Sequence, residues 1–310
     1  MERQTAAARF RGSRWFALVW VLPVALAAAV VVVLVAQWAR QQPSIQSFIV
    51  QYPGQSALPA AAPVGFPAWL SIQHFLNTLF MLFVLRTAWQ LRSKKRPSAF
   101  WTRINTGLIR TKNPPVRIGL PLWFHLSIDA LWVLNGLVYV VLLFTTGQWM
   151  RLVPTRLDLI PNAASAALQY ASLDWPVSDG WVNYNALQQL AYFATVFVAA
   201  PLALASGIRL SPGLAAALRP LDRIVPLRAT RLVHVGTWIW FLAFIAAHVT
   251  LVLATGALRN LNHMYAGRND DSWWGFAIFA ASLVVLIVAW VAAQPTVLAA
   301  IAGRTGTVRR

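Results

Sequence analysis

Two histidines, His234 and His248, lie fourteen residues apart in RLVHVGTWIWFLAFIAAHVT, a stretch that is otherwise almost entirely apolar. A neutral imidazole is a common metal ligand and a common axial ligand of haem iron. Fourteen residues of helix rise about 21 Å and make nearly four whole turns, so the two rings would point in one direction at different depths. One metal ion could therefore not bind both.

Two further apolar stretches carry one histidine each: His74 lies in SIQHFLNTLF and His125 in PLWFHLSIDA. As membrane-crossing helices, these stretches place His74 level with His248 and His125 level with His234. Two imidazoles from different helices at one depth can hold the iron of a b-type haem without covalent attachment. The residues therefore predict two haems b, stacked across the bilayer. The alternative is that each ring only hydrogen-bonds a neighbouring helix or lies at headgroup level.

The elements that would position these rings are membrane-spanning helices. Hydrophobic residues make up 58% of the 310 positions, mean hydropathy is +0.59 and 11% of residues are charged, which is too apolar for a soluble domain. A spanning helix needs about 20 mainly apolar residues. Six stretches satisfy this: 15–37, 68–91, 121–146, 184–207, 232–256 and 274–294. The first has a longer apolar run than the roughly 7 to 15 residues of a secretion signal, so we expect a retained helix.

We accordingly expect an all-α integral membrane protein whose six transmembrane helices form one domain over residues 1–310. Helices 2 to 5, within residues 68–256, would form a four-helix haem-binding core, because helical bundles build cofactor sites from side chains that converge between helices. The helices at 15–37 and 274–294 would lie outside this core.

Lysine and arginine residues orient the chain, because 20 of the 26 fall in one set of segments and five in another. The first set is the N-terminus, 92–120, 208–231 and the tail after 294, and the second is 38–67, 147–183 and 257–273. The positive-inside rule predicts that the first set, with both termini, is cytoplasmic. This topology accounts for the net charge of +18, so we expect no nucleic acid partner and only secondary contact with anionic lipid.

Residue types and motifs that the sequence lacks exclude several cofactors and activities. The chain has no cysteine, which excludes iron–sulfur clusters, covalently attached c-type haem and disulfides. It contains no Walker loop and no strand-linked glycine fingerprint, so nucleotide-driven transport and a resident flavin or nicotinamide have no support. Electron transfer remains as the expected activity.

Three stretches resemble a known family: WLSIQHFLNTLFMLF, NYNALQQLAYFATVFVAAPLALASGIRLSP and HVTLVLATGALRNLNHMYAGR. With the four histidines, they resemble the membrane cytochrome b subunits of formate dehydrogenase, nickel-iron hydrogenase and thiosulfate reductase, in particular the bacterial thiosulfate reductase cytochrome b-like branch. The similarity runs from about residue 65 to 270 and leaves the first and sixth helices outside. It implies a di-haem cytochrome in the bacterial inner membrane that transfers electrons between the quinone pool and a catalytic redox subunit, often a molybdopterin oxidoreductase.

Two charged residues within the spans also need partners, because a bare charge in lipid is costly. Asp129 shares a face of its helix with His125, and Arg86 lies near the same depth one helix earlier. One interpretation is an Arg86–Asp129 ion pair that joins the two helices. The other is functional: Arg86 neutralises a haem propionate, and Asp129 relays protons to quinone near the inner haem.

Four more residues are weaker candidates. Asn77 and Asn135 could support the haem environments or bridge helices, and Gly136 could leave room for the outer haem edge or allow close helix packing. His263, in the last outer loop, is expected to be an exposed loop histidine. A role in quinone binding or partner contact is the alternative.

The outer segments are the expected docking surface for an exported catalytic subunit. The 147–183 segment is long for a loop and is predicted to contain a short interfacial helix. The outer segments also carry aromatic anchors of the kind that interfaces favour: Trp149, Tyr170, Trp175, Trp181 and Tyr265. Two other functions stay open: a self-contained haem oxidoreductase that acts on a small oxidant, and a haem-free anchor or transporter whose histidines relay protons.

Overall fold

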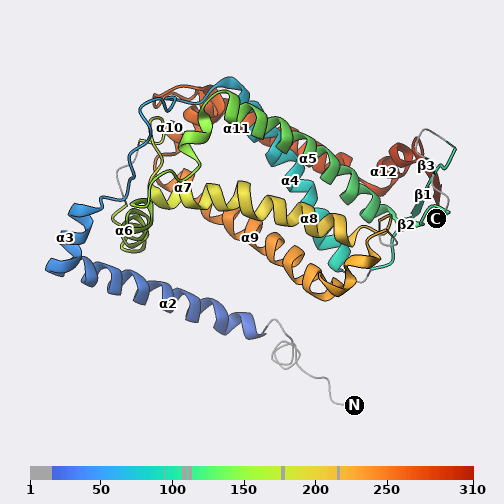
Figure 1. Ribbon diagram of the computed structural model, residues 1–310, viewed down its shortest axis with the longest axis horizontal. Coiled ribbons are helices and arrows are strands. Elements are labelled where there is room, and N and C mark those ends of the chain that lie inside the picture. Colours follow the sequence, from blue (N-terminus) through green and yellow to red (C-terminus); the bar gives the residue numbers. More distant parts are fainter. Residues whose placement is uncertain (1–15, 94, 107–109, 111–113, 176–178, 215–216) are drawn as a thin grey trace, which may run out of the picture. The chain divides into compact units, whose positions relative to one another are not determined.

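The computed structural model describes residues 16–310 except 94, 107–109, 111–113, 176–178 and 215–216, and these residues are mostly helical (Figure 1). Six helices are long and apolar enough to cross a membrane: Val19–Arg40, Ala68–Arg92, Leu120–Thr145, Ala186–Leu210, Leu227–Ala254 and Trp274–Ala292. Each overlaps one predicted span. The prediction of a helical membrane fold with six spans is therefore confirmed, and the described residues add one small sheet.

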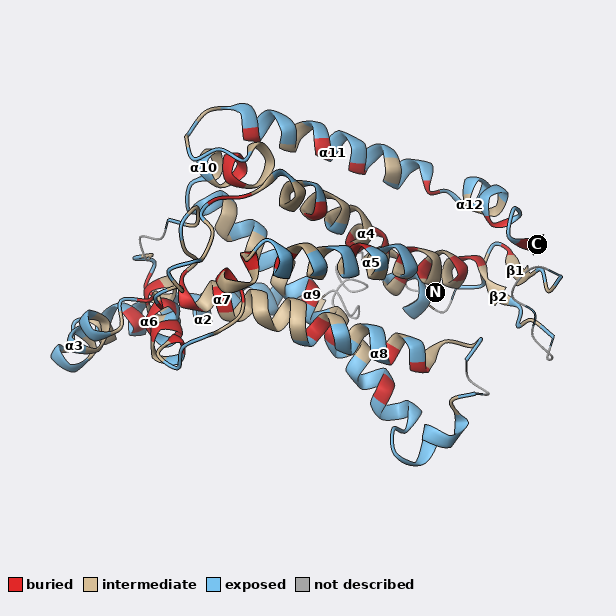
Figure 2. Ribbon diagram, turned by 45° about the horizontal axis from the view of Figure 1, so that its top comes forward, coloured by how far each residue is buried: buried red, intermediate tan, exposed pale blue. Residues whose placement is uncertain are grey.

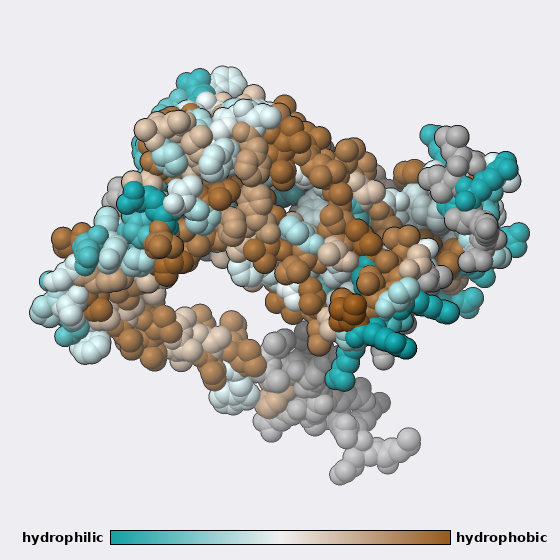
Figure 3. Space-filling model, in the orientation of Figure 1, coloured by the Kyte–Doolittle hydropathy of each residue, from teal (hydrophilic) through white to brown (hydrophobic). Residues whose placement is uncertain are grey.

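The spanning helices turn large apolar side chains outward. Leu134 and Val288, for example, are 60% and 61% exposed, and pale blue runs along much of these helices in Figure 2. On the face shown in Figure 3, hydrophobic side chains cover the helices of the central bundle, and hydrophilic ones gather over the β1–β2 segment and the α8–α9 connection. Lipid tails, rather than water, are the solvent that suits such a surface.

The chain divides into two compact units, which are described separately. Unit 1 comprises residues 1–57, 154–179 and 183–190, and unit 2 comprises 58–153, 180–182 and 191–310. All five histidines belong to unit 2. The grouping of residues 1–310 into one membrane domain stays a prediction.

Unit 1 is built from α2 (Phe16–Arg40), α3 (Pro43–Gln51), α6 (Leu159–Ala171) and the beginning of α7 (Ala186–Phe193). The helix expected within the long outer segment is α6. Asn162 on α6 accepts a hydrogen bond from the Gly54 amide at 3.0 Å, and the Gly54 carbonyl accepts one from the Ala186 amide at 2.8 Å. Gly54 has a φ of +100°, a conformation that disfavours any side chain.

Unit 2 contains the remaining spans. They are α4 (Ala68–Arg92), α5 (Leu120–Thr145), the end of α7 continued by η2 (Ala194–Ala199) and α8 (Ala200–Leu210), α9 (Leu227–Ala254) and α11 (Trp274–Ala292). Shorter elements join them: η1 (Gln148–Arg151), η3 (Arg219–Arg223), α10 (Ala257–Leu261), η4 (Asn262–Ala266), α12 (Pro295–Ala302), β1 (Phe100–Arg103), β2 (Ile118–Gly119) and β3 (Gly306–Arg309). Within this unit α4 packs on α5, and α8 packs on α9.

The fourth span is not a regular α-helix throughout, because η2 is a π-helical segment. Pro201 follows it by two residues and has no backbone N–H to donate to the preceding turn. Its ring also crowds the carbonyl of the residue four positions earlier, which favours a locally widened helix. This widened turn lies between two side chains that face the histidines, Tyr192 and Ser206.

A small antiparallel sheet joins two segments that the sequence analysis left without regular structure. Its strand order is β2-β1-β3, with Phe100 opposite both Gly119 and Arg309. The Trp101 indole donates to the Ala302 carbonyl at 3.1 Å, and Gly306 lies so close to this ring that a side chain would not fit. The sheet ties the 92–120 segment to the C-terminal tail, so both lie on one side of the membrane. We call this side, which the 208–231 segment shares by span parity, the basic side.

The shared side can be tested by cysteine labelling, since the natural chain has no cysteine. We expect Thr106→Cys and Thr305→Cys to react with a membrane-impermeant maleimide from the same side of sealed vesicles. Asp271→Cys should react only from the opposite side, because α11 crosses the membrane between residues 271 and 305. Labelling of Thr106→Cys and Thr305→Cys from opposite sides would contradict the β1–β3 pairing.

Candidate functional site

The structure brings four histidines together in two pairs. The ring centroids of His74 on α4 and His248 on α9 are 6.3 Å apart, and those of His125 on α5 and His234 on α9 are 6.4 Å apart. These are the pairs that matched depth predicts. We call His74 and His248 the outer pair, and His125 and His234 the inner pair, which lies nearer the basic side. Their function as iron ligands stays a prediction.

The spacing within each pair fits a shared metal ion. Metal–imidazole bonds are about 2 Å long, so an ion between two facing rings separates their centroids by roughly 6 Å. Among the described residues, no group of three or more His, Cys, Asp or Glu side chains could hold a metal ion. Two imidazoles therefore suit an ion whose other ligands come from a macrocycle, as haem iron does.

Two hydroxyl groups orient the rings of the inner pair. Thr87 Oγ1 lies 2.7 Å from His125 Nδ1, and Ser206 Oγ lies 3.0 Å from His234 Nδ1. Each hydroxyl also donates to a carbonyl four residues earlier in its own helix, at 2.7 Å for Thr87 and 2.6 Å for Ser206. A hydroxyl has one hydrogen, so its remaining lone pair accepts from the ring Nδ1–H. Both Nε2 atoms are then left with a free lone pair, the form of histidine that binds iron.

Other groups border the inner pair closely. His125 Nε2 is 3.5 Å from a carboxylate oxygen of Asp129, four residues later on α5. A bond from this nitrogen to iron and a hydrogen bond from it to the carboxyl group exclude each other. Opposite, a Cβ placed on Gly207 would be 3.5 Å from His234 Cε1, which is ordinary van der Waals contact.

Arg86 does not pair with Asp129, and the prediction of that ion pair is wrong. Its guanidinium donates to the carbonyls of Trp290 and Ala293 at 2.8 and 3.0 Å and lies 4.3 Å from the centroid of the Trp290 indole. These carbonyls are among those that the end of α11 leaves without helical partners. Arg86 therefore joins the second and sixth spans. Its predicted contact with a haem propionate stays a prediction.

Aromatic rings surround the outer pair. Phe244 stacks on His248 with ring centroids 5.6 Å apart and planes 4° apart, and Tyr192 meets the same imidazole edge-on at 6.2 Å. Tyr265 meets His74 edge-on at 5.9 Å, and burial raises the pKa of its phenol, which keeps it neutral. His74 Nδ1 is buried without a hydrogen-bond partner in the described part of the chain. Burial of a nitrogen without a hydrogen-bond partner costs folding free energy, and a bound metal or hydrogen-bonding group would offset that cost.

An apolar layer separates the two pairs. Phe241 lies seven residues from both His234 and His248 on α9, and its ring meets Trp132 of α5 at 6.1 Å. Met81 and Ala199 are buried beside Phe241, and the side chains packed against them are those of Leu85, Trp132, Ala200, Ala203 and Ile245. We call this cluster the apolar layer.

The weaker candidates have distinct surroundings. Asn77 accepts a hydrogen bond from the Trp132 indole at 3.0 Å, so it bridges α4 and α5 beside the apolar layer. Asn135 is buried, and a Cβ placed on the neighbouring Gly136 would meet nothing within 4 Å. This open space fits the predicted room for a haem edge. None of these observations tests a cofactor role for the three residues.

The expectation that His263 is an exposed loop histidine is wrong, because it is 4% exposed. Its ring stacks on Phe66 at 5.7 Å and meets Trp181 at 5.2 Å, and its Nε2 is 2.7 Å from the Asn269 side-chain oxygen. The ring belongs to a packed cap of outer segments, and its predicted contacts with quinone or a partner stay untested.

Arg151, fully buried, holds the same cap together by donating to the carbonyls of Gly65 and Gly180 at 2.7 and 2.5 Å. Neither membrane depth nor helical periodicity predicts this role of Arg151. All five predicted docking aromatics make ring contacts within the protein: Trp149 with Phe144, Trp181 in the cap, Tyr265 with His74, and Tyr170 with Trp175. They contribute less free surface to a partner than expected.

Comparison of the chain with known proteins identifies no relative. No protein-family model matches the chain, and no curated protein or solved structure matches it significantly. The function therefore has to be argued from the geometry of the two histidine pairs.

The orienting hydroxyl of Thr87 can be tested with a nearly isosteric substitution. We expect Thr87→Val to weaken haem retention at the inner pair about 10- to 100-fold, because the partner that orients a ligating histidine contributes about that much to metal affinity. Haem content after graded detergent washing measures this. Thr78→Val is the matched control, since the Thr78 hydroxyl donates to the backbone carbonyl of His74. Equal losses in the two variants would contradict the orienting role.

Proposed function

We propose that this protein is a di-haem b-type cytochrome that transfers electrons across the membrane between the quinone pool and a partner redox enzyme. The observation that carries the proposal is the pair of histidine sites, with ring centroids 6.3 and 6.4 Å apart at two levels of one bundle. His74 and His248 would hold one haem, and His125 and His234 the other.

A bis-histidine haem, when bound, supplies a one-electron Fe(III)/Fe(II) couple with no open position for substrate. The residues of the chain supply orientation and exclusion of water. Thr87 and Ser206 hold Nδ1 of the inner rings, which leaves Nε2 available. Around the outer pair, the rings of Tyr192, Phe244 and Tyr265 limit access of water.

The apolar layer favours electron transfer over the haem-free proton relay. Proton transfer across a membrane needs a chain of titratable or hydrogen-bonding groups. Between the two histidine levels, the chain instead places Met81, Phe241 and their apolar neighbours. Electrons need no such chain of polar groups. The His125–Asp129 contact would support a proton relay, but this contact is confined to the inner level.

We further propose the orientation, the location and the partners. The positive-inside rule makes the basic side cytoplasmic, in a bacterial inner membrane. Quinone would react near the inner pair, where Asp129 could exchange its proton. A catalytic subunit that contains molybdopterin would dock on the outer side, where the cap over the outer pair offers a platform built on Arg151 and His263.

The two sites should empty independently. We expect His74→Ala or His248→Ala to lower the haem content from two per chain to one and to remove the outer haem. His125→Ala or His234→Ala should remove the inner haem instead, because each haem takes both axial ligands from one level. Pyridine haemochrome analysis gives the stoichiometry, and redox titration of the visible spectrum distinguishes the haems.

His263→Phe is the control for this series, since a phenyl ring can keep the stack on Phe66. It should retain both haems. The proposed pairing is wrong if His74→Ala and His125→Ala remove the same spectral component. A wild-type protein that binds no haem b would overturn the proposed function.

Asp129→Asn tests the proton-exchange role with little change in size. We expect quinol-driven haem reduction to slow by about 10²-fold or more, as for other losses of a proton-transfer group. Haem content and reduction by dithionite should stay at the wild-type level, because neither requires this carboxyl group. Quinol-driven reduction at the wild-type rate would remove Asp129 from the proposal.

A further inference from the structure

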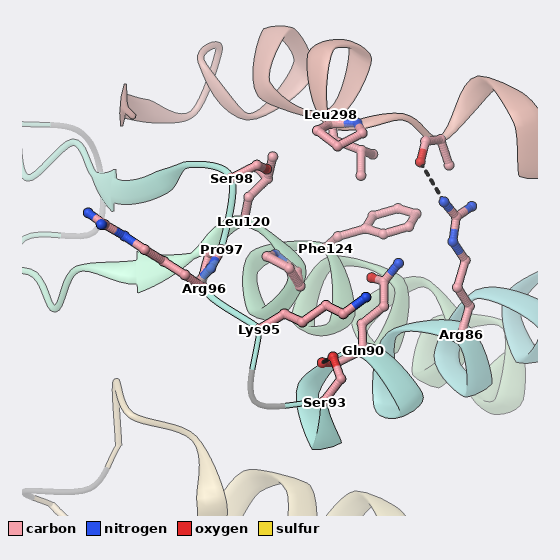
Figure 4. Close-up of a pocket in the computed structure, with 13 residues that line it drawn as sticks. Arg86, Gln90, Ser93, Lys95, Arg96, Pro97, Ser98, Leu120, Phe124 and Leu298 are labelled. Carbon is pink, nitrogen blue, oxygen red and sulfur yellow. Dashed lines mark hydrogen bonds between the residues drawn. The ribbon is translucent and has the colours of Figure 1, made fainter. Parts of the chain in front are cut away.

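A pocket of about 310 Å³ opens on the basic side of unit 2, and none of the five histidines lines it (Figure 4). The end of α4, the segment that follows it, the beginning of α5 and the α11–α12 junction form its walls. The pocket adjoins the inner pair in sequence, since Arg86 precedes Thr87 and Phe124 precedes His125, but its lining has a different chemistry.

The lining has a cationic side and an apolar side. In Figure 4 the Lys95 side chain extends towards Gln90, and the Arg86 guanidinium lies beyond Gln90, where it donates to the Ala293 carbonyl. Phe124 and Leu298 form the opposite apolar wall, with Leu120 beside them. Arg96 also lines the pocket, but its side chain points away from the centre in this view.

The cationic side has no carboxylate to balance it among the residues that the structure describes. None of the residues that line the pocket is acidic, and the sequence of segment 92–120 contains no acidic residue. Arg86 donates to two uncharged carbonyls, so its charge is not neutralised there. The amino terminus of α5, at Leu120 and Pro121, opens onto the same space and adds the positive end of a 26-residue helix.

The depth of the pocket matches the boundary between lipid tails and headgroups. Arg86 lies six residues before the end of α4, about 9 Å along the helix. The neighbouring Trp290 lies two residues before the end of α11, where indoles commonly occupy the membrane interface. A ligand here would meet cations towards the water and apolar side chains towards the membrane.

We propose that this pocket binds one anionic phospholipid, with its headgroup phosphate between Lys95 and Arg86 and an acyl chain along Phe124 and Leu298. A neutral lipid or quinone would leave the cations without a counter-charge. Free phosphate would leave the apolar wall without a partner. The proposal does not depend on haem binding.

Native mass spectrometry of the full-length protein in mild detergent can test this proposal. The protein is titrated with phosphatidylglycerol and, separately, with phosphatidylcholine of the same acyl chains. We expect one tightly bound phosphatidylglycerol per chain and weaker phosphatidylcholine. Lys95→Ala should weaken phosphatidylglycerol binding about fivefold, the effect of roughly 1 kcal/mol per cation near a lipid surface. Arg110→Ala is the control, because Arg110 is an exposed cation of the same segment outside the pocket.

A photoactivatable acyl chain gives a second readout that does not depend on a variant. It should crosslink to the peptides that contain Phe124 or Leu298. Equal affinity for the two lipids, or equal effects of Lys95→Ala and Arg110→Ala, would overturn the proposal. Displacement of phosphatidylglycerol by millimolar inorganic phosphate would also overturn it, because the site would then bind a free anion.

Discussion

An imidazole between membrane-spanning helices must find partners for its nitrogens inside the protein, because the hydrocarbon around it offers none. The two pairs meet this constraint differently. The inner rings have Nδ1 bound by the hydroxyls of Thr87 and Ser206, which themselves stay bound to their own helices. At the outer level His74 Nδ1 is buried and has no hydrogen-bond partner among the described residues. Helix packing in unit 2 follows from this constraint, since α4, α5, α8 and α9 must all approach closely enough to reach the rings.

The same arrangement places the side chains of the apolar layer between the two histidine levels. Polar groups collect at the level of each pair, whereas Phe241 and Trp132 occupy the interval between them. One polar contact lies beside this layer, where Asn77 accepts a hydrogen bond from the Trp132 indole. An electron can pass between two redox centres through apolar side chains. Among the described residues, a carboxylate contacts a histidine at the inner level, where Asp129 lies beside His125.

The ends of the bundle are ordered by contacts between segments far apart in the sequence. On the outer side, Arg151 and the stack of Phe66, His263 and Trp181 combine three segments into a cap. On the basic side, the β2-β1-β3 sheet and the Arg86 contacts hold the C-terminal part of the chain against α4 and α5. Both arrangements satisfy backbone carbonyls or strands that would otherwise be left open at the membrane boundary. The pocket beside Arg86 is a consequence of the second one.

Hydropathy, charge and helical period by themselves determined the six spans and which histidines face each other, because depth and direction along a helix are local properties of the chain. They did not determine how each helix is rotated against its neighbours. Arg86 therefore lies against α11 instead of Asp129, and Thr87 and Ser206 gave no sign of their contact with the rings. The sheet and the burial of His263 also escaped prediction. Both depend on pairing between segments separated by many residues, and only the tertiary structure decides which of those segments meet.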